Sequence, residues 1–202
     1  LFAEAGEPDD ADQNWAPATP EDFAAYAGDY EIFPGVIFAL RAEAGGLTFA
    51  PYGAPRTDLE PLPQVGPREF LLSATPERTL IFDAPIGVPS ANLGYRLGMD
   101  GVINAPRSEL APFEASSVDL SAYVGRCESA ELNTFYDIKL QDEGLILSHA
   151  RRADFALTPY QTDTFAGQGP LQKLEFKRDA EGQMIGFYAS APLSENVWFS
   201  CE

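Results

Sequence analysis

The stretch that decides the fold is Asp22–Tyr30 (DFAAYAGDY), because the chain carries a second copy of it at Asp119–Cys127 (DLSAYVGRC). Each copy is typical of a short helical turn with an apolar face and a Tyr, followed by a Gly that ends the turn before a strand. With 202 residues, the chain can hold two domains of ordinary size. The repeat therefore predicts one structural unit used twice.

Matching residues continue through both halves of the chain. The matched pairs are Gly46-Leu47 with Gly144-Leu145, Pro61 with Pro159, Phe70 with Phe165, Leu80-Ile81-Phe82 with Leu174-Glu175-Phe176, and Gly94-Tyr95 with Gly186-Phe187. Small changes in turn length account for the drift in their spacing. We interpret the two halves as an internal duplication.

Short strand patterns separated by turn residues fill both halves. Tyr136–Leu140 alternates with a period of two, residues 141–144 (QDEG) form a turn, and a second strand follows at Leu145–Leu147. The first half shows similar patterns, including one at Thr57–Leu62. Eight such strands in each half predict an all-β fold of two tandem, antiparallel, up-and-down barrels.

A short helix is expected before each barrel. Thr19 caps the first helix, and Ser117 caps the second, which covers Val118–Val124. The expected organisation is an acidic linker or tail at 1–18, a first barrel at 19–106, a linker at 107–117 and a second barrel at 118–202. Because the chain begins with Leu1 and shows no signal peptide, we expect a processed product or an excised piece.

The formal net charge of −18 limits which partners can be expected. Such a surface repels phosphate backbones, so nucleic acid is not expected as a partner. No apolar run reaches the roughly 20 residues of a membrane span, and none is expected.

The two cysteines fall on strands that a closed barrel makes neighbours. Cys127 lies in the first strand of the second unit and Cys201 in its last strand, whereas the first unit has Tyr30 in place of Cys127. A disulfide across this closing seam fits the reach of adjacent strands and implies an oxidising compartment, periplasmic or secreted. The alternative is a pair of buried free thiols.

A search for catalytic and metal-binding motifs yields few candidates. The sequence contains no CxxC, HExxH, GxSxG or phosphate-binding glycine loop, and it has a single histidine. We therefore expect no catalytic residue, no metal and no cofactor in this chain. A carboxylate-based hydrolase or isomerase is a minor alternative.

The densest cationic spot is His149-Ala150-Arg151-Arg152. His149, Arg151 and Arg152 can anchor an anion or carboxylate at a barrel rim, because guanidinium binds carboxylates through two hydrogen bonds. The alternative is a hairpin loop whose arginines pair with acids such as Asp154. Seven aromatic residues either fill the core or line a pocket: Tyr136, Phe155, Tyr160, Phe165, Phe176, Phe187 and Trp198.

The doubled Phe/Leu-x-x-Tyr-x-Gly opening, the Gly-Leu hairpin, the Leu-x-Phe strand and the Gly-Phe/Tyr strand carry a family resemblance. Residues 19–202 resemble the tandem lipocalin-like barrels at the C-terminus of serine hydrolases of the penicillin-binding protein and β-lactamase superfamily, D-aminopeptidase type. The resemblance implies a non-catalytic accessory module that shapes or restricts access to the hydrolase active site. Cys127 and Cys201 depart from that family's pattern.

Two functions are therefore expected. The first is the accessory module, whose partner is a serine-hydrolase catalytic domain in cis or another protein surface. The second is a free-standing lipocalin-like binder of a small apolar or amphipathic ligand, which requires an open cavity in one barrel.

Overall fold

The computed structural model describes residues 18–52, 59–74, 77–98, 101–108, 110, 113, 115–167 and 170–202. The acidic segment expected at 1–18 lies outside these residues except for Ala18. The chain divides into two compact units whose main boundary falls between Arg107 and Ser108. Each unit is described by itself.

The first unit contains one helix and eight strands. They are α1 (Pro20–Ala24), β1 (Gly28–Phe33), β2 (Val36–Glu43), β3 (Gly46–Pro51), β4 (Gln64–Gly66), β5 (Glu69–Ala74), β6 (Glu77–Phe82), β7 (Asn92–Leu97) and β8 (Val102–Ser108). Thr19 caps α1 as predicted, and it exchanges hydrogen bonds with Asp22 in a capping box.

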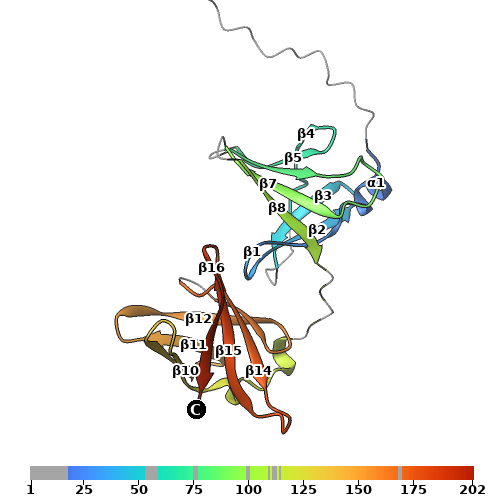
Figure 1. Ribbon diagram of the computed structural model, residues 1–202. Helices are drawn as coiled ribbons and strands as arrows, with labels where there is room; N and C mark the ends of the chain where they lie inside the picture. The colour runs from blue at the N-terminus through green and yellow to red at the C-terminus, as the bar shows by residue number, and fades with distance from the viewer. Residues whose placement is uncertain are drawn as a thin grey trace, which may run out of the picture. The chain divides into compact units, whose positions relative to one another are not determined.

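The strands of the first unit form a sheet in the order β3-β2-β1-β8-β7-β6-β5-β4 (Figure 1). The first and last strands, β1 and β8, are neighbours, as an up-and-down barrel requires. Within the described residues, however, no pairing of β3 with β4 joins the two edges of the sheet. The strands that the structure describes in the first unit thus form an open, half-barrel sheet, and the expected closure of this barrel is not seen among them.

The gap between β3 and β4 has a local cause. A strand was expected at Thr57–Leu62, and its described part, Leu59–Leu62, is not strand, so this prediction is wrong there. Pro61 and Pro63 lack the N–H group that a ladder needs. The Leu62 amide between them still donates to the Leu47 carbonyl of β3, at 2.7 Å.

The second unit begins with two 3₁₀ turns, η2 (Ala115–Ser117) and η3 (Leu120–Tyr123). The expected helix at Val118–Val124 is thus a shorter 3₁₀ turn. Asp119 caps it by accepting a hydrogen bond from the Ser121 amide, and the prediction that Ser117 is the cap is wrong. An Asp at this position can satisfy a free amide of the first turn just as a Ser can.

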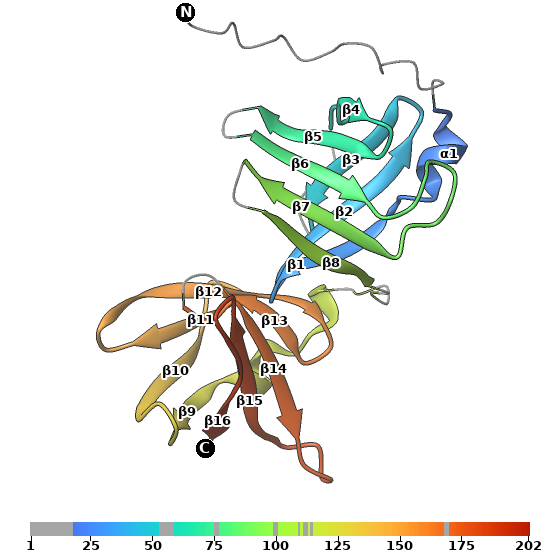
Figure 2. The ribbon, with the colours of Figure 1, turned by 45° about the horizontal axis from the view of Figure 1, so that its top comes forward.

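Eight strands follow in the second unit. They are β9 (Gly125–Ser129), β10 (Thr134–Gln141), β11 (Gly144–His149), β12 (Arg152–Gln161), β13 (Thr164–Gly167), β14 (Lys173–Arg178), β15 (Met184–Ala191) and β16 (Ser194–Cys201). These antiparallel strands close into a barrel, as predicted for this unit (Figure 2). The last strand pairs with the first, with Ser200 opposite Glu128 and Cys201 opposite Cys127.

The core of the second unit lies inside the barrel. Alternating residues point inward, so that Tyr136 and Ile138 of β10 are buried while Lys139 is exposed. Aromatic rings pack the interior, including stacked Phe187 and Phe199 with centroids 4.9 Å apart.

The repeated Tyr has the same place in both units. Tyr26 and Tyr123 are both buried, and each meets the matching phenylalanine edge to face: Tyr26 on Phe70 at 6.1 Å and Tyr123 on Phe165 at 4.7 Å. Burying a large aromatic side chain contributes about 1.5–3 kcal/mol. The repeated stretch therefore supplies an aromatic side chain to the core of each unit.

Candidate functional site

A pocket of about 520 Å³ opens at one end of the second barrel. The β9–β10, β11–β12, β13–β14 and β15–β16 connections meet at this end, because consecutive antiparallel strands alternate in direction. We call it the mouth pocket. Its apolar wall includes Leu132, Leu171, Ala189 and Val197, and its hydroxyl groups include those of Thr134, Ser190 and Ser194.

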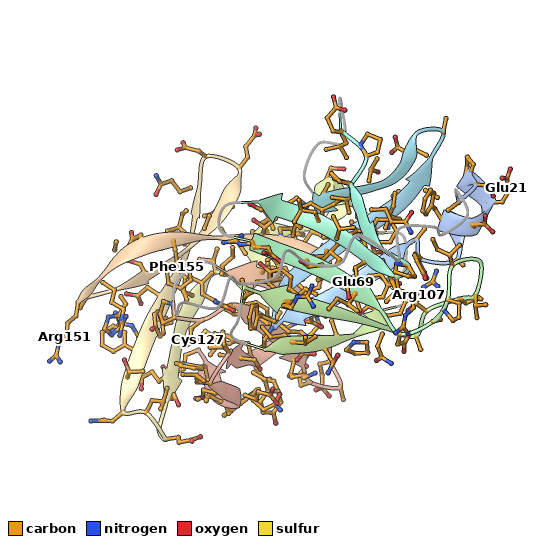
Figure 3. The ribbon with its side chains drawn as sticks, turned by 90° about the horizontal axis from the view of Figure 1, so that it is seen from above. Glu21, Glu69, Arg107, Cys127, Arg151 and Phe155 are labelled. Carbon is orange, nitrogen blue, oxygen red and sulfur yellow. A yellow bond between two sulfur atoms is a disulfide. The ribbon has the colours of Figure 1, made fainter. Side chains whose placement is uncertain are left out.

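The three predicted site residues His149, Arg151 and Arg152 all line the mouth pocket. The β11–β12 hairpin carries them, and His149 lies directly opposite Arg152 in the antiparallel pair. Figure 3 shows Arg151 at the end of this hairpin, with its side chain extending beyond the ribbon. Arg151 is therefore a rim residue.

His149 ties the hairpin to the neighbouring strand. Its Nδ1 atom accepts a hydrogen bond from the Arg151 amide at 3.1 Å, and its Nε2 atom lies 3.1 Å from Thr134 Oγ1. Because Nδ1 is an acceptor here, the proton of a neutral ring is on Nε2, which donates to Thr134. The ring centroid also lies 5.0 Å from that of Tyr136.

The two arginines do not pair with acids. Asp154, the expected alternative partner, accepts a hydrogen bond from Ser148 Oγ at 2.8 Å. Within the part of the chain that the structure describes, Arg151 and Arg152 form no ion pair. None of the described residues that line the pocket is acidic. In a chain with a net charge of −18, the mouth pocket is thus a local cationic site.

Tyr136 supplies a further polar group to the mouth pocket. Its side chain is only 5% exposed, and its hydroxyl has no hydrogen-bond partner among the described residues. Burial raises the pKa of Tyr136, and the positive charge of Arg152 opposes part of that rise. The hydroxyl therefore keeps its proton at neutral pH and can donate a hydrogen bond.

The other aromatic candidates do not line the mouth pocket. Phe165, Phe176 and Phe187 belong to the core of the barrel, and Phe155 packs against that core. Tyr160 is buried, whereas Trp198 lies beside Tyr188, with ring centroids 4.9 Å apart. The sequence places Tyr136 in the same group, and the structure separates it from the others because it alone of the seven lines the mouth pocket.

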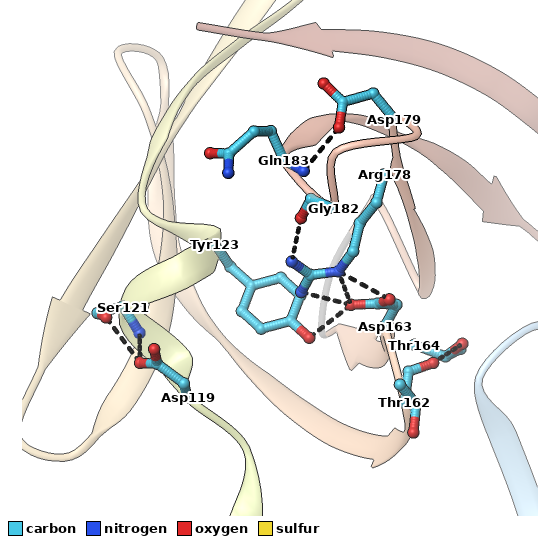
Figure 4. Close-up of polar contacts among 10 residues, drawn as sticks. All are labelled: Asp119, Ser121, Tyr123, Thr162, Asp163, Thr164, Arg178, Asp179, Gly182 and Gln183. Carbon is cyan, nitrogen blue, oxygen red and sulfur yellow. Dashed lines mark hydrogen bonds and ion pairs between the residues drawn. The ribbon is translucent and has the colours of Figure 1, made fainter.

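The opposite end of the barrel holds a paired cluster that sequence reasoning missed (Figure 4). Arg178 binds Asp163 through Nε and Nη2, with a shortest contact of 2.8 Å, and the Tyr123 hydroxyl donates to Asp163 at 2.7 Å. Arg178 lowers the pKa of Asp163, and burial raises the pKa of Tyr123. The charges of Arg178 and Asp163 neutralise each other. Because Tyr123 belongs to η3, its hydrogen bond to Asp163 holds η3 on the barrel.

The cysteines lie where the sequence predicts them, on β9 and β16. The structure joins Cys127 to Cys201 by a disulfide, with Cα atoms 4.0 Å apart. The alternative of two free thiols is therefore wrong. In the first unit, Tyr30 takes the matching place and is fully buried, with its ring edge to face on Phe82 at 6.2 Å.

Two other kinds of site are absent from the described residues. No group of three or more His, Cys, Asp or Glu side chains there could hold a metal ion. No helix in the same part of the chain is long and apolar enough to cross a membrane. Among known proteins, neither a family model nor a curated protein matches this chain.

Proposed function

We propose that this chain is a binding module whose second barrel holds a small amphipathic anion in the mouth pocket. One observation carries the proposal: two arginines that form no ion pair with a described residue line a pocket in which no described residue is acidic, within a strongly acidic protein. Unpaired guanidinium groups beside a concave surface favour the binding of an anion.

The wall of the mouth pocket indicates the chemical character of the uncharged part of the ligand. Leu132, Leu171 and Val197 offer an apolar surface next to the cationic rim. A ligand with a charged group and an apolar body satisfies both parts of the pocket. Lipocalins use an eight-stranded barrel in a comparable way, to hold one small molecule.

The disulfide supports a periplasmic or secreted location for this function. Disulfides persist in oxidising compartments and are rare in the cytosol. The Cys127–Cys201 bond closes the barrel that carries the pocket. A module that binds a ligand outside the cytoplasm accounts for both features.

Isothermal titration calorimetry with small organic anions tests the proposal. We expect the full chain to bind at least one of them, and the double variant Arg151→Gln/Arg152→Gln to bind it at least tenfold more weakly. The control is Arg78→Gln, which removes an exposed charge of the first unit and leaves the pocket intact. Equal affinity in the double variant and the control contradicts the proposal, and so does a wild type that binds none of the anions.

A second candidate is the accessory module of a serine hydrolase. Leu193, at the β15–β16 turn, is 100% exposed and suits a contact with another domain. The coding sequence upstream of Leu1 tests this candidate. A domain with a Ser-x-x-Lys motif supports it, whereas a signal peptide followed directly by this chain argues against it.

A further inference from the structure

We infer that the anionic group of the ligand is a carboxylate, bound by the Tyr136 hydroxyl and the Arg152 guanidinium together. This inference rests on the proposed function and adds the chemical class of the ligand. It also assigns Tyr136 as the residue that determines specificity. Neither role follows from the cationic rim alone.

Among the described residues, the hydroxyl of Tyr136 has no acceptor, whereas those of three other buried tyrosines do. Tyr26 donates to the Ala84 carbonyl at 2.6 Å, Tyr30 to the Tyr26 carbonyl at 3.0 Å, and Tyr123 to Asp163 at 2.7 Å. Among the described buried side-chain atoms, the Tyr160 hydroxyl lacks a partner, but the Tyr136 hydroxyl is not one of these enclosed atoms, so water or a ligand in the pocket can reach it. Because Tyr136 lines the mouth pocket, an acceptor on a ligand can satisfy its hydroxyl.

The barrel register brings Arg152 near Tyr136. Asp137 pairs with Ser148 across β10 and β11, so Tyr136 and His149 are next in register, and His149 pairs with Arg152 across β11 and β12. Tyr136 and Arg152 therefore lie two strands apart, a backbone separation of roughly 10 Å, which their two long side chains span. The charge of Arg152 also acts on the tyrosine hydroxyl.

A hydroxyl donor and a guanidinium donor that line the same pocket suit an anion with two oxygens. One oxygen of a carboxylate can accept a hydrogen bond from the Tyr136 hydroxyl, and the other can accept from the Arg152 guanidinium. Arg151, at the rim, adds attraction for the approaching anion.

The charge of the ligand follows from the burial of Tyr136. Moving an anion next to a buried ring removes water from the anion, and the penalty grows steeply with its charge. A carboxylate has one negative charge, whereas a phosphate monoester has up to about two near neutral pH. The pocket therefore favours a carboxylate over a phosphate monoester.

Calorimetry on the full, oxidised chain tests this inference with three probes that share one apolar body: octanoate, octanamide and octyl phosphate. We expect octanoate to bind most tightly, and octanamide to bind at least tenfold more weakly because it has no charge. Tyr136→Phe should weaken octanoate binding by roughly ten- to a hundredfold, as expected for the loss of a hydrogen bond to a charged group.

Tyr188→Phe is the matched control, because Tyr188 is 37% exposed and does not line the mouth pocket. Octyl phosphate binding as tightly as octanoate, or Tyr136→Phe binding like the control, overturns the carboxylate inference alone. Octanamide binding as tightly as octanoate, or failure of both anionic probes to bind, overturns the inference and the proposed function together.

Discussion

At the scale of single residues, the two ends of the second barrel differ in whether their arginines form ion pairs. Arg178 is held by Asp163, whereas Arg151 and Arg152 have no acidic partner among the described residues. A paired charge stabilises the fold, and an unpaired charge beside a pocket is available to a ligand. The pairing of each arginine therefore distinguishes a structural cluster from the proposed binding site.

Replacing Asp163 by Asn should destabilise the second unit by about 1–3 kcal/mol at pH 7, because the charged hydrogen bonds to Arg178 and Tyr123 are weakened. Asn tolerates the positive φ of 55° at this position. Urea denaturation measures the loss of unfolding free energy.

The effect of this substitution should depend on pH. The folded-state pKa of Asp163 is lowered, so its contribution is present above the unfolded value of about 3.9 and is lost as the pH falls through the folded value. The difference in unfolding free energy between wild type and variant should therefore shrink below about pH 4. A difference that stays constant down to about pH 2 contradicts this assignment.

The site could be predicted from sequence only in part. The cationic run pointed to His149, Arg151 and Arg152, because basic residues are rare in this sequence. Tyr136 could be recognised only as an aromatic residue of the core or of a pocket. Its proposed role depends on a hydroxyl that has no partner among the described residues, and the residues that surround this hydroxyl come together only when the barrel closes.

At the scale of elements, backbone pairing and the disulfide both close the β9/β16 seam. The Cys127→Ser/Cys201→Ser variant should lose about 4 kcal/mol of unfolding free energy, because the bond constrains a long loop in the unfolded chain. Denaturant unfolding measures this loss. Thiol labelling of the unreduced, denatured wild type should modify neither cysteine, and labelling of both would show that the bond is absent.

The strands of the second unit could be predicted because their residues alternate between core and solvent. Tyr136–Leu140 shows this pattern and lies within β10. The gap between β3 and β4 could not be predicted in the same way. Pro61 has a counterpart in Pro159, yet Pro159 lies within the ten-residue strand β12, whereas Pro61 is not in a strand. Pro61 has a second proline nearby, Pro63, and Pro159 does not, so the matched residue alone does not decide strand pairing there.

At the scale of the whole molecule, the strands that the structure describes form an open sheet in the first unit and a closed barrel in the second. The edge strand β4 pairs with β5 alone among the described strands, whereas β16 has a partner on each side. Backbone amides of β4 should therefore exchange with solvent faster than those of β16. Hydrogen exchange measured residue by residue checks this difference, and equal protection of the two strands would indicate that the first sheet closes in solution.

The mouth pocket of the second barrel is proposed to bind an organic carboxylate. The most direct test of this proposal is a two-dimensional ¹H–¹⁵N NMR titration of the full chain with octanoate. We expect saturable shifts of backbone amides concentrated at Thr134, Tyr136, His149, Arg151 and Arg152, and the loss of these shifts in the Arg151→Gln/Arg152→Gln variant. Shifts that are absent from the wild type, or that lie elsewhere and persist in this variant, would contradict the proposal.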